Sequence, residues 1–304
     1  MKLRFAAVPL LALVALACGS TQPSVSPPTS RPPTTAPSAP TSATPTPTLA
    51  PTSTPKAPTP SPLRSPTPGG AALLLEVTNE GGFISPSAHL GELPSVVVDT
   101  AGDIYTADPN ATAQTLVPAV VVRDVGANGA AQILAAMRAA GLDHAGTSGV
   151  PGDAGVTVFT AEIDGQEVVN RIAPSGPGGP GHPGASPNPA IDLLNRLLDP
   201  AETWGAADVS NAHFAPIAYK VYVAPATGTG TTVDWPLTTA LANFGTAAQP
   251  DFGVTGLRSG VVLDADAATL AGALGTTPAG TLVKSDGQPY QVWIRPLLPP
   301  ELNQ

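Results

Sequence analysis

The sequence predicts an α+β protein in which one or more antiparallel sheets carry four short amphipathic helices on one face. Three observations favour this class: nine β-branched runs separated by turn residues, four helical segments with an apolar stripe, and a Pro/Thr/Ser-rich stretch that precedes them all. Short strands joined by tight turns are typical of antiparallel sheets, and an apolar stripe on a short helix is typical of a helix that covers a sheet.

The first 17 residues have the order of a cleaved export signal. Lys2 and Arg4 are followed by the apolar run Ala6–Ala17, and Cys18, the single cysteine of the chain, comes directly after it. This run is well short of the ~20 apolar residues that a membrane-spanning helix needs. We therefore predict a signal peptide over residues 1–17.

The signal and its cysteine resemble the lipobox of bacterial lipoproteins, in which the thiol is diacylated and becomes the new N-terminus. Ala15 stands three residues before Cys18, where leucine is usual in that family. The resemblance implies lipid attachment at Cys18 and an extracytoplasmic protein that is lipid-anchored to the bacterial cell membrane. The alternative is an ordinary secretory signal with a cysteine nearby.

Residues 18–70 consist of Cys18, which we expect to be lipidated, and a linker rich in Pro, Thr and Ser. Frequent proline removes backbone donors, and Thr and Ser bury little apolar surface, so we expect a disordered, extended tether. At ~3.1 Å per residue it would reach roughly 160 Å when stretched. A globular domain over residues 71–304 follows, and it could divide into sub-units of about 71–188 and 189–304.

The globular part is strongly acidic. Residues 71–304 contain 8 Lys and Arg against 22 Asp and Glu, and 8 − 22 gives a net charge of −14. Such a surface repels nucleic acid, so we expect no nucleic-acid partner. A solvated surface explains this charge, and cation binding is the alternative. With no disulfide available, the domain must be held by its hydrophobic core.

The helices and strands can be placed by periodicity. Three helices have apolar residues at i, i+3, i+4 and i+7, and the fourth, 188–198, has Asn188 as its N-cap and Pro189 in its first turn. The other three cover 130–137, 237–244 and 267–274. The predicted strands are 73–78, 95–99, 119–123, 156–163, 167–173, 217–224, 257–263, 281–284 and 290–295.

One order of elements occurs twice: an apolar strand, Asp, helix, Gly, and then a hairpin that turns on Asp-Gly-Gln. The two turns are Asp164-Gly165 and Asp286-Gly287. Asp-Gly suits a type I′ turn because both central residues need a positive φ. This recurrence indicates a possible internal duplication, and chance recurrence of a common hairpin signal is the alternative.

Motifs with a specific chemistry are weak in this chain. Asp99 and Asp103 flank a hairpin turn, which we favour over a calcium site, and the Gly/Pro-rich segment 174–187 is predicted to be a flexible inserted loop. The G-x-G-x-x-G within that segment is interrupted by prolines and opens no helix. The four histidines have no metal-ligand spacing. We therefore expect no cofactor, no metal and no catalytic residue that can be named.

Five of the 13 Trp, Tyr and Phe residues of the chain lie between residues 204 and 235, together with His213. Trp204, His213, Tyr219 and Trp235 could line a pocket for an apolar or sugar ligand. Alternatively, these side chains fill the core of the second half of the domain.

Three segments of the globular part resemble a group of uncharacterised exported and lipid-anchored proteins of high-GC bacteria. They are Leu93–Asp99 with Gly102, Leu116–Pro118, and Ile294–Pro299. The resemblance implies an exported domain of unknown function and carries no site residue with it.

Two classes of function follow. In the first, the protein is a monomeric, membrane-anchored envelope lipoprotein that presents an acidic binding or structural module to an envelope protein or glycan. In the second, it is a cell-envelope hydrolase that uses scattered carboxylates, for which Glu162, Glu167, Asp208 and Asp234 are the candidates. The distance between two such carboxylates in the folded protein decides which chemistry they can perform.

Overall fold

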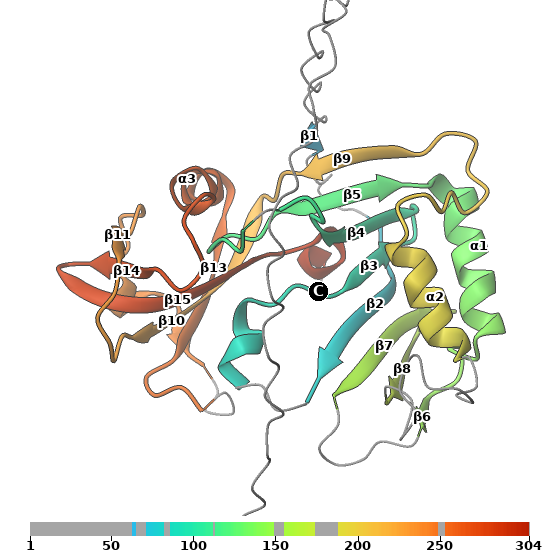
Figure 1. The fold of residues 1–304 in the computed structure, drawn as a ribbon, viewed down its shortest axis with the longest axis horizontal. Helices are drawn as coiled ribbons and strands as arrows, with labels where there is room; N and C mark the ends of the chain where they lie inside the picture. Colours follow the sequence, from blue (N-terminus) through green and yellow to red (C-terminus); the bar gives the residue numbers. More distant parts are fainter. Residues whose placement is uncertain are drawn as a thin grey trace, which may run out of the picture. The chain divides into compact units, whose positions relative to one another are not determined.

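The computed structural model describes residues 63–64, 71–81, 86–111, 113–148, 155–173, 188–248 and 253–303. The predicted signal peptide, Cys18, nearly all of the linker and the loop 174–187 lie outside the described residues. The described part is α+β, with two mostly antiparallel sheets and three α-helices (Figure 1).

The first sheet has nine strands, and all neighbours are antiparallel except the two outermost pairs. Its order is β1 (Leu63–Arg64), β9 (Ser210–Phe214), β5 (Val120–Asp124), β4 (Asp103–Ala107), β3 (Val96–Asp99), β2 (Leu73–Glu80), β7 (Val156–Ile163), β8 (Gln166–Ile172) and β6 (Gly146–Ser148).

The second sheet has six strands, and it is antiparallel except for its first pair. Its order is β11 (Thr232–Asp234), β14 (Leu282–Ser285), β15 (Gln288–Pro296), β10 (Ala218–Pro225), β13 (Arg258–Leu263) and β12 (Thr246–Ala247). All nine strands that the sequence predicts are present in one sheet or the other, with ends that differ by a few residues.

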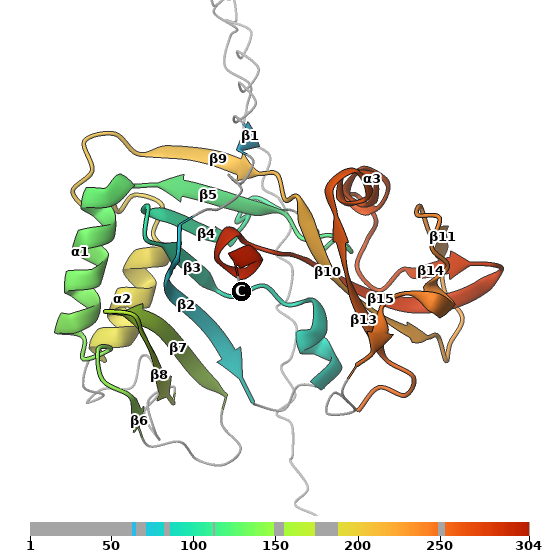
Figure 2. The same ribbon diagram turned by 180° about the vertical axis from the view of Figure 1, so that it is seen from behind.

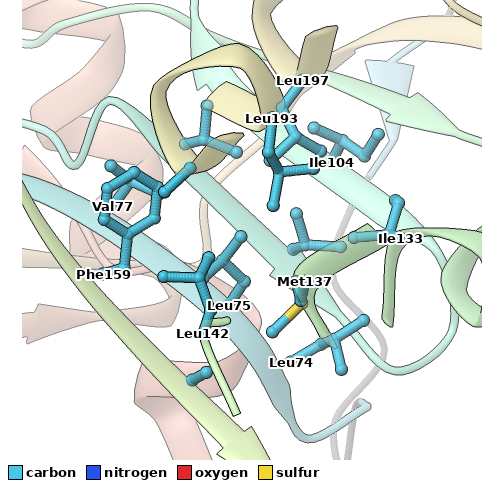
Figure 3. Close-up of a cluster of buried hydrophobic side chains, with 14 of the residues drawn as sticks. Leu74, Leu75, Val77, Ile104, Ile133, Met137, Leu142, Phe159, Leu193 and Leu197 are labelled. Atoms are coloured by element: carbon cyan, nitrogen blue, oxygen red, sulfur yellow. The ribbon is translucent and has the colours of Figure 1, made fainter. Parts of the chain in front are cut away.

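Two helices, α1 (Gly126–Ala139) and α2 (Pro189–Leu198), lie side by side on one face of the nine-stranded sheet (Figure 2). The Asn188 side chain accepts a hydrogen bond from the Ala190 N–H, which confirms the predicted N-cap. Between the helices and the sheet lies the largest buried cluster (Figure 3). Its members include Leu75, Val77, Ile104, Ile133, Met137, Phe159, Leu193 and Leu197.

The third helix, α3 (Asp264–Leu274), packs on the six-stranded sheet instead. Its Ala267, Leu270 and Leu274 are buried against strand residues such as Val221 and Ile294. The prediction that the helices share one face is therefore wrong, because α3 covers a different sheet from α1 and α2.

The predicted helix at 237–244 is also wrong. The segment is irregular and ends in a short 3₁₀ turn, η2 (Leu241–Asn243). Its backbone groups are used elsewhere: the Leu241 N–H donates to Ser285 Oγ at 3.1 Å, and the Thr239 carbonyl accepts from Trp235 Nε1 at 2.9 Å. Leu241 and Phe244 are still buried, so the apolar pattern reports burial rather than helix.

The structure does not support the internal duplication. Both Asp-Gly turns have the predicted positive φ at each central residue, and both join antiparallel strands. However, the first hairpin (β7 and β8) belongs to the nine-stranded sheet and is separated from β5 by the three strands β4, β3 and β2. The second (β14 and β15) belongs to the six-stranded sheet and is separated from β13 by β10 alone. The two units therefore have different topologies.

The chain passes from the first sheet to the second between Phe214 and Ala218, so α2 and β9 still belong to the first. After β15 it returns to the nine-stranded sheet, where the 3₁₀ turn η4 (Pro299–Asn303) follows. Leu298 packs there with Val97 and Phe214, on the face opposite α1 and α2. None of the helices in the described ranges has the length and apolar character needed to cross a bilayer.

Candidate functional site

A cleft of about 830 Å³ is lined by residues of both sheets. One wall is β15, through residues 291–294, and the facing segments are 91–95, the connection from β4 to β5, and the turn 279–281 before β14. Ligand sites of proteins are usually clefts of this size, so this cleft is the candidate site.

Backbone hydrogen bonds join two of the irregular segments beside the cleft, the connection from β4 to β5 and the turn before β14. The Leu116 N–H donates to the Thr277 carbonyl at 2.8 Å, and the Ala279 N–H donates to the Gln114 carbonyl at 2.9 Å. Thr115 thereby forms an isolated antiparallel bridge with Pro278. These two parts of the cleft lining are therefore held together by main-chain contacts between segments that are far apart in sequence.

A second wall begins at the 3₁₀ turn η1 (Pro86–Gly91). Its Leu90 is buried in a small cluster with Ala224 and Leu257, and Trp293 of β15 packs against the same cluster. Trp293 is half-buried and lines the cleft. A partly exposed indole provides a flat apolar surface for a ligand.

The charged lining residues of the cleft, within the described chain, are Glu92 and Asp108. Their side chains are 44% and 10% exposed. Asp108 Oδ1 accepts a hydrogen bond from the Asn110 N–H at 2.8 Å, and Oδ2 lies 3.7 Å from His213 Nδ1. Glu92 Oε2 lies 2.6 Å from His89 Nδ1. Each acid therefore has a histidine beside it, and no lysine or arginine occurs among the described residues that line the cleft.

The four residues that the sequence nominates as a pocket are not brought together. Trp204 is buried between α1, α2 and the first sheet, where the Arg196 guanidinium lies 4.2 Å from the centre of its ring. Tyr219 and Trp235 are buried in the core of the second sheet, and burial raises the pKa of Tyr219 to about 12. His213 is half-exposed on β9, and it approaches the cleft through Asp108.

The four carboxylates nominated for hydrolysis are all exposed. Glu162 and Glu167 face each other across β7 and β8, Asp208 precedes β9, and Asp234 ends β11 in the other sheet. None of them lines the cleft.

Sequence reasoning missed Trp293, Glu92 and Asp108. The sequence pattern could have indicated Trp293, because this residue lies between Val292 and Ile294, whose side chains are buried in the core of the second sheet. Its own side chain must therefore lie on the other side of the strand. An aromatic residue on the other side of such a strand has to be covered by a different element or by a ligand. Glu92 and Asp108 lie in irregular segments, where no periodicity marks them.

A separate group of charges lies where β15 meets the first sheet. Arg295 Nη1 is 2.6 Å from Glu301 Oε1, and Glu301 Oε2 accepts from the Leu298 N–H at 2.9 Å. Burial raises the pKa of Glu76 on β2, and the nearby charge of Glu301 raises it further. No cluster of three or more potential metal ligands occurs among the described residues.

Comparisons with protein-family models, with curated proteins and with solved structures gave no match for this chain. The function must therefore be argued from the cleft itself.

Proposed function

We propose that this chain is a lipid-anchored protein of the bacterial cell envelope whose acidic domain binds a positively charged ligand in the cleft. One observation supports a positively charged ligand: the charged side chains that line the cleft, Glu92 and Asp108, are both acidic. The net charge of −14 over residues 71–304 has the same sign. Such a field attracts cations toward the cleft and repels anions.

The anchor is supported by the signal that precedes Cys18. Two acyl chains hold a protein stably on a bilayer, whereas a single chain gives marginal binding. We expect the wild-type chain in the membrane fraction with a modified N-terminal cysteine, and the Cys18→Ser chain in the soluble extracytoplasmic fraction. Mass spectrometry of the N-terminus decides this, since an unmodified wild-type Cys18 would contradict the anchor.

Ligand binding can be followed through Trp293. Trp204 and Trp235 are buried, so a ligand in the cleft should change the emission of Trp293 most. We expect basic peptides, polyamines or amino-sugar oligosaccharides to shift this emission and to raise the melting temperature, since a ligand that binds the folded state stabilises it. The Trp293→Phe chain should lose the emission shift. Equal responses to basic and acidic ligands would contradict the proposal.

A hydrolase is the second candidate, because one cleft contains two carboxylates. Glycoside hydrolysis uses such a pair, with one acid protonating the leaving oxygen. Steady cleavage of a bound amino-sugar oligosaccharide by the wild-type chain, abolished by Asp108→Asn while the substrate still binds, would favour the enzyme. Binding with no product would favour the binding module.

A further inference from the structure

Each acid of the cleft is paired with a histidine, and the first pair is fixed by the 3₁₀ turn η1. His89 and Glu92 are three residues apart, and a 3₁₀ turn places residues i and i+3 on the same side. The Glu92 N–H donates to the His89 carbonyl at 3.3 Å, while Glu92 Oε2 lies 2.6 Å from His89 Nδ1. A proton taken up by His89 therefore arrives in direct contact with one of the two acids that line the cleft.

The second pair spans the strand β5. Val121 of β5 pairs with Thr106 of β4 on one side and with His213 of β9 on the other. Asp108 comes two residues after Thr106, and side chains two residues apart along a strand lie on the same face. Asp108 Oδ1 accepts from the Asn110 N–H, whereas Oδ2 is 3.7 Å from His213 Nδ1. His213 therefore lies beside the oxygen that the Asn110 bond leaves available.

The charges of the strands that contact η1 are engaged with other groups. η1 packs on β10 and β15, where Lys220 and Arg295 are cross-strand partners. The Lys220 ammonium lies over the Tyr222 ring, 5.7 Å from its centre, and Arg295 Nη1 is 2.6 Å from Glu301 Oε1. This leaves the acid at the end of η1 as the partner of its histidine.

The strands beside His213 likewise leave Asp108 as its charged partner. β1 pairs with His213 through Leu63, which has no charge. On β5, Arg123 lies on the same face of the sheet, but its guanidinium donates to main-chain carbonyls at the C-terminal end of α2. Each histidine of the cleft therefore has one acid in contact with it.

We propose that the cleft binds its cationic ligand when His89 and His213 are neutral and releases it when both are protonated. This inference rests on the proposed function and adds the regulation of the same site. A neutral imidazole leaves the charge of the adjacent carboxylate uncompensated, whereas an imidazolium ion cancels it. An ordinary histidine changes its charge between about pH 5 and 8, where ordinary carboxylates remain ionised. The attraction of the cleft for a cation therefore weakens as pH falls through this range.

The coupling between proton and ligand acts in both directions. If protonation of the histidines weakens ligand binding, the ligand must displace protons from them to the same extent. Ordinary carboxylates carry almost no proton above about pH 5, so protons released by binding near neutral pH report on the histidines.

The test uses the purified full chain and the peptide acetyl-pentalysine-amide, with binding measured by calorimetry. The charge of this peptide is constant over the range of the test, because an ordinary lysine titrates at about pH 10.4. We expect the peptide to bind about fivefold or more weakly at about pH 5.5 than at about pH 8. At about pH 6.5, titrations in two buffers of different ionisation enthalpy should show that binding releases protons.

The double variant His89→Gln with His213→Gln keeps a polar side chain beside each acid but cannot become charged there. It should bind the peptide equally well at about pH 5.5 and about pH 8 and release no protons, and each single variant should release fewer protons than the wild type. His144→Gln is the matched control, because His144 Nδ1 also lies 2.7 Å from an acid, Asp143, and this pair does not line the cleft. The control should keep the pH dependence of the wild type.

Three outcomes would overturn the inference. Equal affinities of the wild type at the two pH values would overturn it and leave the proposed function in place. A double variant with the melting temperature and the pH dependence of the wild type would do the same. Absence of peptide binding at both pH values would contradict the proposed function together with its regulation.

Discussion

Asp99 organises the first hairpin of the nine-stranded sheet. Its Oδ1 atom accepts hydrogen bonds from the backbone N–H groups of Ala101, Gly102 and Asp103, each at 3.0 Å. Gly102 has a φ of 95°, and a Cβ there would lie 2.2 Å from the Gly126 carbonyl oxygen. The hairpin role that the sequence predicts for Asp99 follows from these contacts, which occupy its carboxylate with backbone donors.

Replacing Asp99 by alanine would remove the side-chain acceptor of three N–H groups in the turn, of which the Gly102 N–H keeps the Asp99 main-chain carbonyl at 3.1 Å. An unsatisfied buried donor costs about 1–3 kcal/mol and the other two donors are only partly buried, so we expect Asp99→Ala to lower the free energy of unfolding by about 1–3 kcal/mol. Asp99→Asn keeps an acceptor oxygen and should cost less. Urea denaturation of both variants checks this, and equal losses would show that the turn bonds contribute little.

Glu76 gives a pH dependence with a defined sign. Its pKa is raised in the folded state, first by burial and then by the charge of Glu301. The folded chain therefore binds more protons than the unfolded chain above the ordinary pKa of 4.5, so the stabilising contribution of Glu76 is lost as pH rises through the folded pKa.

We expect Glu76→Gln to gain stability relative to the wild type as pH rises from about 4 to 7, because it removes this proton linkage. Denaturation curves at several pH values measure the difference, with the exposed Glu162→Gln as the control for loss of one negative charge. A difference that moves the other way would show that Arg295 dominates the environment of Glu76.

At the scale of single elements, the two helices that the sequence describes in the same way differ in what they bury. Leu270 of α3 is fully buried, whereas Leu134 of α1 is half-buried, because Ile133 and Met137 point into the core instead. The i, i+3, i+4 and i+7 pattern of the helix predicted at 130–137 includes Leu134 and so predicts that it is buried like Leu270, which is wrong. The other three residues of the predicted stripe, Ala130, Ile133 and Met137, are buried as expected, together with Gly129.

Leu270→Ala should accordingly cost about 2–5 kcal/mol, the range for a fully buried leucine, and Leu134→Ala should cost clearly less. Gln166→Ala and Gln288→Ala, at exposed positions after the two Asp-Gly turns, should stay within about 0.5 kcal/mol. Thermal and urea denaturation of the four variants measure these costs. A loss at Leu134 as large as that at Leu270 would contradict the observed orientation of α1.

Much of the secondary structure could be predicted because long strands carry β-branched runs and Asp-Gly turns. The two-residue and three-residue strands β1, β6, β11 and β12 were missed, since so few residues show no periodicity. The five-residue strands β4 and β9 were also absent from the predicted strands. The segment 237–244 has a helical pattern, but bonds to Trp235 and Ser285 hold it in another conformation. The cleft could not be predicted, because it is built where both sheets and irregular segments meet.

At the scale of the whole molecule, the chain crosses between the two sheets twice, after β9 and after β15. The pairing of residues 114–116 with 277–279 joins segments that are remote in sequence, and Leu298 returns the C-terminal end to the first sheet. Such shared contacts favour one cooperative unfolding transition over two.

A chain that begins at Ala71 should therefore unfold in a single transition, with a melting temperature that does not depend on reductant, since it contains no cysteine. It lacks β1, whose two residues pair with β9, so a small loss of stability relative to the full chain is expected. Calorimetry tests this. Two separate transitions would show that the sheets fold independently.

The most direct test of the account is the affinity of one basic ligand for two matched double variants. Glu92→Gln with Asp108→Asn removes the two acids of the cleft, and Glu162→Gln with Glu167→Gln removes two exposed acids that face each other across β7 and β8. The net charge changes equally in both. We predict that the cleft variant binds about tenfold or more weakly while the control binds as the wild type does. Equal weakening in both variants would contradict the cleft as the binding site, because the ligand would then be responding to the overall charge of the domain.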